Sequence, residues 1–252
     1  MPRQSRKKSS TGIYHVILRG VNRQNIFEDD KDRQKLMETI GYYKEISSYK
    51  LYGYCLMNNH IHLLIKETEE SISNIVKRIS SSYVYWYNKR YDRCGHLFQE
   101  RFKSEVVETD AYFVTVLRYI HQNPIKAGII KEVEKYLWSS YREYIGNSIY
   151  TDINFALGLF SEDKIKAIKL FEKYMNEEND DQCLEYTEKL NISDDEVIGY
   201  FHNIGIDNIS KLQRIEKEKR NEYIRKIKNI EGITVRQLAR VTGISKSVIG
   251  RI

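Results

Sequence analysis

Apolar and polar positions in the first 150 residues repeat with two different periods. The two-residue period of a strand covers 14–20, 51–57, 60–66 and 104–108. The period of a helix, with apolar residues three and four apart, covers 30–49, 71–91 and 110–123. The resulting order β-α-β-β-α-β-α predicts an α+β fold. We expect a ferredoxin-like antiparallel sheet with helices on one face and the other face free for a ligand.

The strand pattern fades beyond residue 150. A capped helix is predicted over 161–175, and the acidic stretch 177–181 is predicted to be a surface loop. The apolar, small and turn positions of a helix-turn-helix are filled by Leu238, Ala239, Gly243, Ile244, Ile249 and Ile252. Thr234 and Ser245 are suited to cap its last two helices. We therefore expect a basic arm over 1–12, an α+β domain over 13–150, an acidic helical linker over 151–210 and a helix-turn-helix region over 211–252.

Charge is distributed in blocks. Residues 1–150 hold 24 basic and 17 acidic side chains, 151–210 hold 5 and 14, and 211–252 hold 12 and 4. Each basic block alone has the composition of a solvated helix surface, but a pair of them favours a polyanion-binding protein. No apolar run approaches the roughly twenty residues of a membrane span, and the N-terminus lacks the apolar core of a signal peptide. We expect a cytoplasmic protein without membrane contact.

Two short segments carry candidate chemistry. Asn58-Asn59 favours a tight turn, and in the strand that follows His60 and His62 point to the same face, so both imidazoles can reach one divalent ion. Tyr119 and Asn123 are four residues apart on one side of a helix, which Pro124 is expected to end near Asn123. An amide ligand and a phenol nucleophile can therefore approach the same ion. A metal with a tyrosine indicates phosphodiester chemistry.

Other residues compete for these roles. The chain has 20 tyrosines, and Tyr112, two turns before Tyr119 on the same stripe, is the nearest rival nucleophile. His121 lies roughly 200° round the helix from Tyr119 and is expected to be structural. His15 and His96 have no partner at ligand spacing, so we leave both outside the metal site. The three cysteines are odd in number and lack a Cys-x-x-Cys pair, which disfavours disulfides and structural zinc.

Four segments resemble a known family. They are YHVILRGVNRQNIFEDD (14–30), YGYCLMNNHIHLLI (52–65), GHLFQERFKSEVVE (95–108) and LRYIHQNPIKAGII (117–130). They resemble the HUH single-tyrosine transposases, most closely the REP-associated tyrosine transposase (IS200-like) branch, over about residues 2–145. The resemblance implies that His60 and His62 bind Mg²⁺ or Mn²⁺ and that Tyr119 is the nucleophile. Asn123 stands where relatives place a polar third ligand, often glutamine.

The resemblance also implies a reaction and its partners. Tyr119 would attack single-stranded or hairpin DNA and form a 5′-phosphotyrosine, which stores the bond for rejoining without ATP. No GxxxxGK[ST] loop is present. Relatives include monomers and homodimers. Candidate DNA contacts are Arg19, Asn22, Arg23, Gln99, Arg101 and Lys103, with Arg236 and Lys246 for duplex DNA.

Two other functions stay open at this point. One is a domesticated DNA-binding regulator that keeps the fold without transposition, although intact His60, His62 and Tyr119 argue against it. The other is an RNA-binding ferredoxin-like domain, whose central strands would present aromatic side chains where this chain has histidines. The aromatic run Tyr83-Tyr85-Trp86-Tyr87 could stack on bases, but packing of its helix on the sheet is favoured.

Overall fold

The computed structural model describes residues 6–185, 192–206, 208–209, 212, 215–230 and 232–252, so the first five residues of the expected basic arm lie outside it. The chain divides into two compact units, 1–186 and 187–252. In the described part of the chain, no helix is both long and apolar enough to cross a membrane.

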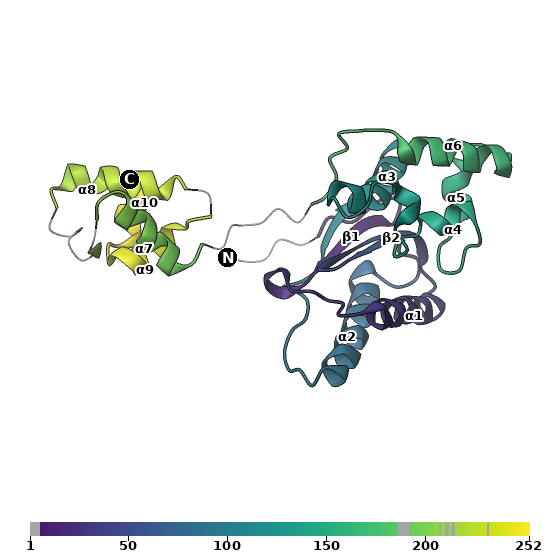
Figure 1. Ribbon diagram of the computed structural model, residues 1–252, viewed down its shortest axis with the longest axis horizontal. Coiled ribbons are helices and arrows are strands. Elements are labelled where there is room, and N and C mark those ends of the chain that lie inside the picture. The colour runs from purple at the N-terminus through teal and green to yellow at the C-terminus, as the bar shows by residue number, and fades with distance from the viewer. Residues whose placement is uncertain (1–5, 186–191, 207, 210–211, 213–214, 231) are drawn as a thin grey trace. The chain divides into compact units, whose positions relative to one another are not determined.

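The first unit is built on one four-stranded antiparallel sheet with the order β2-β3-β1-β4. Figure 1 labels β1 and β2 of this sheet. The strands are β1 (Ile13–Arg19), β2 (Lys50–Met57), β3 (His60–Lys66) and β4 (Lys103–Val106). A two-residue turn joins β2 to β3, as the asparagine pair predicts. The central strands β1 and β3 pair along their full length, from Ile13 opposite Lys66 to Arg19 opposite His60.

Two helices cover one face of the sheet, α1 (Asp30–Ser47) and α2 (Ile72–Arg90) (Figure 1). The start of α1 has a capping box, in which the Asp29 side chain accepts from the backbone N–H groups of Lys31 and Asp32. The Asp32 carboxylate is fully buried and pairs with Arg90 at the end of α2, 2.7 Å away. A buried charge needs such a partner, so this pair ties the two helices together.

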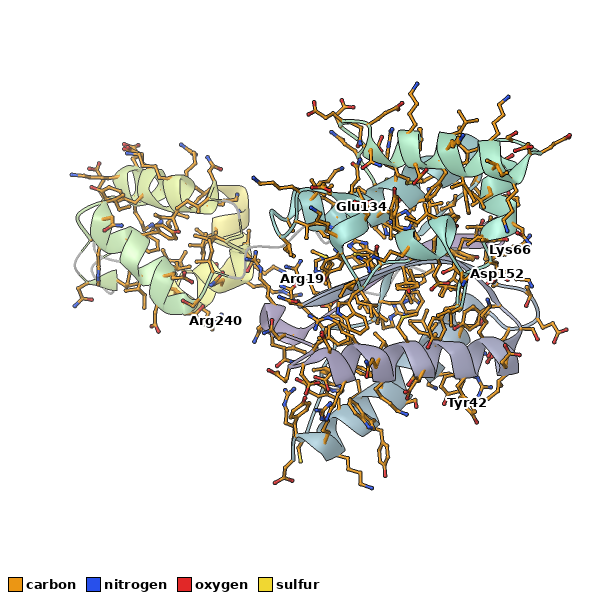
Figure 2. The ribbon with its side chains drawn as sticks, turned by 45° about the vertical axis from the view of Figure 1, so that its right-hand side comes forward. Arg19, Tyr42, Lys66, Glu134, Asp152 and Arg240 are labelled. Carbon is orange, nitrogen blue, oxygen red and sulfur yellow. The ribbon has the colours of Figure 1, made fainter. Side chains whose placement is uncertain are left out.

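The opposite face is also covered by helices, which corrects the expectation of a free face. The helices are α3 (Asp110–Lys126), α4 (Tyr141–Ile145), α5 (Ile153–Gly158) and α6 (Lys164–Asn176), with short 3₁₀ turns η1 (Val21–Arg23) and η2 (Val133–Lys135) elsewhere in this unit. Apolar side chains of β2 and β3, such as Cys55 and Leu64, join Leu117 of α3 and Phe171 of α6 in a second core. Side chains fill the space on both sides of the sheet (Figure 2). Strands whose two faces are both apolar need cover on both sides.

The boundaries of the elements are close to those expected, with one clear difference. Helix α3 continues three residues past the predicted end at Asn123, with Pro124 inside it. A proline late in a helix removes only one backbone hydrogen bond. The Ala127 N–H bonds to the Asn123 carbonyl and completes the last turn.

The described residues of the second unit form helices, α7 (Asp194–Asn203), α8 (Lys217–Lys228), α9 (Val235–Thr242) and α10 (Lys246–Arg251), and no strand. Its core includes Val197 and Phe201 of α7 together with Leu238 and Ile249. The expected boundaries at 150 and 210 are therefore displaced. Helices α5 and α6 share a core with α3, and α7 packs with the last three helices.

Of the two helix caps expected in the second unit, one forms a side-chain hydrogen bond and the other does not. The Thr234 side chain accepts from the Gln237 N–H and caps α9 as predicted. Ser245 occupies the position before α10 but makes no side-chain cap hydrogen bond. Gly243 ends α9 in the left-handed conformation, at φ 69°, where a glycine is favoured.

The close approach of α3 to β2 at Gly53 gives a test of the second core. A Cβ at Gly53 would lie 2.7 Å from Leu117 Cδ1. We expect Gly53→Ala to lower the free energy of unfolding by about 1–3 kcal/mol through overpacking. The cost should shrink in a Leu117→Val background, as measured by urea unfolding. Gly158→Ala, whose Cβ would meet nothing within 4 Å, is the control. If Gly53→Ala lowered the free energy of unfolding equally in the wild-type and Leu117→Val proteins, Leu117 would not be the side chain that limits the space at Gly53.

Candidate active site

A cavity of about 200 Å³ lies between the central strands and α3. Its lining residues are Ile17, Arg19, His60, His62, Tyr119, Asn123 and Glu185. The cavity therefore brings together all four residues predicted as nucleophile and metal ligands. It adds one acidic residue that the sequence did not point to, Glu185.

The pairing of β1 with β3 determines how these side chains meet. Arg19 is opposite His60 and Ile17 is opposite His62, so four side chains project from one face at neighbouring positions. Leu18 and Ile61 point to the other face and join the core under α1 and α2. Helix α3 then places Tyr119 and Asn123, one turn apart, over the same part of the sheet.

His60 faces Asn123 through atoms that both carry lone pairs. Its Nδ1 lies 2.6 Å from Asn59 Oδ1, which can only accept, so Nδ1 carries the proton. The Nε2 atom of the neutral ring is then an acceptor, and Asn123 Oδ1 is 3.3 Å from it. Two electron-pair donors at this separation are an arrangement that a cation between them would satisfy.

His62 is held by a third histidine. The His62 Nδ1 and His15 Nε2 atoms are 2.9 Å apart, and the two rings stack with centroids 5.2 Å apart. His15 is fully buried and His62 nearly so. The His62 Nε2 atom is buried without a hydrogen-bond partner among the described residues. An orphaned ring nitrogen in a polar cavity is a position that suits a ligand.

Burial keeps these imidazoles uncharged. It lowers the pKa of His15 to about 3 and that of His60 to about 4; at His60 the Asn123 contact opposes the effect of burial and the Arg19 charge adds to it. Burial also lowers the pKa of His62 well below its ordinary value, helped by the two neighbouring histidines. All three rings are therefore neutral at pH 7, the form in which histidine binds a metal.

Tyr119 is 3% exposed, and its hydroxyl donates to Glu185 Oε1 at 3.2 Å. Burial, followed by the Glu185 charge, raises the pKa of this phenol above its ordinary value. The ammonium of Lys126 lies 4.7 Å from the centre of the Tyr119 ring. Without a further cation, the hydroxyl therefore stays protonated at neutral pH.

The acidic segment 177–185 packs along α3. Arg118 makes a two-bond ion pair with Asp181, at 2.7 and 2.9 Å, and Gln122 donates to the Glu177 carbonyl at 3.0 Å. The Lys126 ammonium donates to the Asp181 carbonyl. The first part of this segment is a surface loop, as expected, with Glu177, Glu178 and Asp180 exposed, although the Asp181 side chain is only 11% exposed. Its contacts place Glu185 beside Tyr119.

The structure separates the predicted DNA contacts into three places. Arg19 lines the cavity, and the Gln99 N–H bonds to its carbonyl at 2.7 Å. Asn22 and Arg23 are exposed in η1 with φ of 50° and 60°, while Arg101 is exposed and Lys103 begins β4 opposite Ile17. The remaining two, Arg236 and Lys246, are exposed on α9 and α10. Their contacts with DNA stay predictions.

The two rival residues lie outside the cavity. The Tyr112 hydroxyl donates to Glu105 at 2.6 Å. His121 is fully buried, bonds to the Ser140 hydroxyl at 2.8 Å and packs on Tyr144, which confirms its structural role.

Sequence reasoning missed His15 and Glu185. His15 has no partner at ligand spacing in the sequence, yet the pairing of β1 with β3 brings it to His62. Its position on the same strand face as Arg19 was a usable signal, because the two are four residues apart in a strand. Glu185 lies 66 residues after Tyr119, and no local pattern in the sequence predicts that it lines the cavity.

The candidate metal ligands do not include a carboxylate. Within the described residues, no group of three His, Cys, Asp or Glu side chains is placed to hold a metal ion. The candidate ligands are two imidazoles and one amide oxygen, so the third position is neutral. A site of this kind relies on imidazole and amide donors rather than on a carboxylate.

Comparison with known proteins supports the resemblance seen in the sequence. Residues 8–123 match the family model described as "Transposase IS200 like". A curated protein of Haemophilus influenzae, "Putative REP-associated tyrosine transposase", is 23% identical over 109 residues, covering 39% of this chain. The chain spans 62% of the length of that relative.

A solved structure has a similar fold. Its description reads "Structure of the REP associates tyrosine transposase bound to a REP hairpin". It matches with a TM-score of 0.52 and 18% identity, covering 60% of this chain and 88% of the other.

The buried neutral histidines predict how stability depends on pH. Burial lowers the pKa of His121 to about 3, against about 6.5 in an unfolded chain. Below pH 6.5 the unfolded state therefore binds more protons, and the free energy of unfolding should fall as the pH drops toward 4. His121→Gln should reduce that slope by up to about 1.4 kcal/mol per pH unit. Urea unfolding at pH 5, 6 and 7 checks this, and equal slopes in both proteins would contradict it.

Proposed function

We propose that residues 8–123, which belong to the IS200-like transposase family, form the catalytic core of an enzyme that cleaves and rejoins single-stranded DNA through Tyr119. The observation that carries the proposal is the convergence of the Tyr119 hydroxyl with His60, His62 and Asn123 in one cavity. All four side chains come from one chain, so we further propose that a monomer holds a complete site.

The chain's own residues fit a divalent ion, Mg²⁺ or Mn²⁺. His60 Nε2, His62 Nε2 and Asn123 Oδ1 would hold it, because the first and third are facing acceptors and the second is orphaned. A bound divalent cation would polarise the scissile phosphate and favour the phenolate of a nearby tyrosine. The Asn123 side chain is one methylene shorter than the glutamine that is frequent in relatives. Its Oδ1 atom nevertheless lies 3.3 Å from His60 Nε2, close enough for both atoms to bind one ion.

The reaction we infer is an exchange of phosphodiester bonds. The Tyr119 oxygen attacks the phosphorus, the bond between phosphorus and the 3′ oxygen breaks, and the 5′ phosphate becomes joined to the tyrosine. The departing 3′ oxygen takes a proton and becomes a hydroxyl. Attack by another 3′-OH on the phosphotyrosine restores the phenol and joins the two DNA ends, so ATP is not needed.

Residues around the cavity have distinct proposed tasks. Glu185 accepts the phenolic hydrogen bond and so orients the nucleophile. Arg19 lines the cavity, where its guanidinium would contact the scissile phosphate. Asn22, Arg23, Gln99, Arg101 and Lys103 would hold the strand on either side.

We extend the proposal to the fold and to the second unit. The strand order and the two crossover helices support a ferredoxin-like first unit. Helices α9 and α10, with Gly243 between them, support a helix-turn-helix that would contact duplex DNA through Arg236 and Lys246. The solved relative is described as bound to a REP hairpin, and a hairpin would present both duplex and unpaired DNA to this chain.

We expect Tyr119→Phe to abolish the covalent protein–DNA adduct while preserving DNA binding, because only the hydroxyl is lost. The adduct is measured by denaturing gel with labelled single-stranded oligonucleotides and Mn²⁺. Tyr112→Phe is the matched control, since that hydroxyl bonds to Glu105 outside the cavity. Adducts that persist in the first variant and vanish in the second would assign the nucleophile to Tyr112. A wild-type protein that binds DNA without forming adducts would favour a regulator.

We expect His15→Phe to weaken Mn²⁺ binding about 10- to 100-fold, because the hydrogen bond between His15 Nε2 and His62 Nδ1 orients the His62 ring, whose Nε2 would bind the ion. Calorimetric titration of the DNA-free protein measures the affinity. His121→Phe is the control, since it also removes a fully buried imidazole with one hydrogen bond. Equal Mn²⁺ affinity in the wild type and His15→Phe would show that the histidine pair has no part in metal binding.

A further inference from the structure

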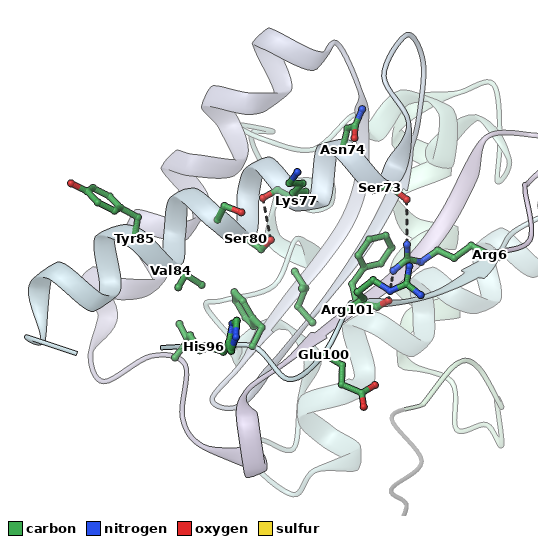
Figure 3. A pocket seen from close by; sticks show the side chains of 15 residues that line it. Arg6, Ser73, Asn74, Lys77, Ser80, Val84, Tyr85, His96, Glu100 and Arg101 are labelled. Atoms are coloured by element: carbon green, nitrogen blue, oxygen red, sulfur yellow. Dashed lines mark hydrogen bonds between the residues drawn. The ribbon is translucent and has the colours of Figure 1, made fainter. Parts of the chain in front are cut away.

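A second and larger hollow lies next to the sheet, between α2 and the segment 96–102 (Figure 3). Its volume is about 650 Å³, within the range of ligand sites. Side chains from α2 form one wall, including Lys77, Ser80 and Tyr85, while Arg6, Glu100 and Arg101 lie on the other side. We refer to this hollow as the α2 groove.

The α2 groove combines an apolar floor with a basic rim. The floor consists of Leu18, Val84, Leu97, Phe98 and Phe102. Its rim carries three full positive charges, Arg6, Lys77 and Arg101, against one negative charge, Glu100. Serine hydroxyls and the Asn74 amide supply further hydrogen-bonding groups. This is the composition of a site for flat apolar rings linked by negative charges.

Arg6 is held in place before any ligand binds. It donates to the Phe102 carbonyl at 3.0 Å and to Ser73 Oγ at 3.3 Å, and its guanidinium lies 3.6 Å from the centre of the Phe102 ring. Burial lowers the pKa of Arg6, and the nearby charge of Arg101 lowers it further. The two guanidinium groups repel each other, and an anion between them would relieve that repulsion.

Tyr85 is the aromatic side chain of the groove most open to solvent. Three of the four aromatic residues in its run are wholly or partly buried, with Tyr83 and Tyr87 packed on the sheet as expected. Tyr85 is 73% exposed instead. An exposed tyrosine on the rim of a basic groove offers a surface on which a base can stack.

The α2 groove and the cavity share one boundary. Leu18 lines the groove, whereas its neighbours Ile17 and Arg19 line the cavity from the other face of β1. The segment 99–101 contacts residues of both the groove and the cavity. The Gln99 N–H bonds to the carbonyl of Arg19, which lines the cavity, and Arg101 lines the groove. A single unpaired strand passing around this segment would touch both places.

We infer that the α2 groove binds unpaired nucleotides of the strand that the cavity cuts, with bases on the Tyr85 side and phosphates at Arg6, Lys77 and Arg101. The inference rests on the proposed function for the identity of the strand. It goes beyond that function by adding a binding site away from the reacting atoms. Three basic groups surrounding an apolar floor complement a nucleic acid better than an acidic peptide, which has no rings to stack.

The test measures binding of labelled oligodeoxythymidine of 15 residues to the full chain by fluorescence anisotropy, with EDTA present so that cleavage plays no part. We expect Tyr85→Ala and Lys77→Gln each to weaken binding at least about fivefold, the lower end for loss of one stacked base. Tyr42→Ala and Lys169→Gln are matched controls on α1 and α6, and both side chains are exposed. Their affinities should stay at the wild-type value. Because all four side chains are exposed, thermal unfolding should be unchanged.

The outcomes separate this inference from the proposed function. Groove variants that bind as tightly as the wild type would overturn the inference, whether or not Tyr119 forms an adduct. Weakened binding in both groove variants would support it even if no adduct forms, and only the proposed function would then fail. The inference would also be overturned, in favour of an acidic-peptide site, by two results together. A decaglutamate peptide would displace the oligonucleotide, and Lys77→Gln but not Tyr85→Ala would weaken the binding of both the peptide and the oligonucleotide.

Discussion

The antiparallel pairing of β1 with β3 is the constraint on which the first unit depends. These two strands are central in the sheet, and their register places Arg19 beside His60 and Ile17 beside His62. A slip of one residue would turn each side chain to the other face, exchanging the histidines for the apolar residues under α1 and α2. The same apolar alternation that builds the first core therefore also aligns the site. Stability and site geometry are set by one pattern of hydrogen bonds.

The sequence was informative wherever function depends on short-range periodicity. His60 and His62 share a strand face and Tyr119 and Asn123 share a helix face, and both relations follow from repeats of two and about four residues. His15 and Glu185 could not be found in this way, because each reaches the cavity through contacts between distant segments. The cover on the second face was missed for a related reason. Cys55 and Leu64 read as ordinary strand residues until α3 and α6 are seen to pack on them.

Pro124 shows the limit of a local rule. A proline disfavours helical geometry in the residue before it, so an end near Asn123 was expected. The helix continues because its last turn needs only a few backbone bonds, and the Ala127 N–H reaches the Asn123 carbonyl. The extra turn carries Lys126, whose ammonium lies over the Tyr119 ring. The local exception thus adds a positive charge beside the proposed nucleophile.

The acidic segment 177–185 has a consequence for the ion atmosphere of the protein. Salt weakens binding to nucleic acid in proportion to the counterions released when cations meet phosphates. Arg118 already shares its charge with Asp181, and Lys126 donates to the backbone of the same residue. A phosphate that replaced Asp181 would take the place of an anion that the protein itself supplies, so Arg118 would release few counterions and add little to the salt slope. Near α3, the number of basic residues therefore overstates the number of ions that binding sets free.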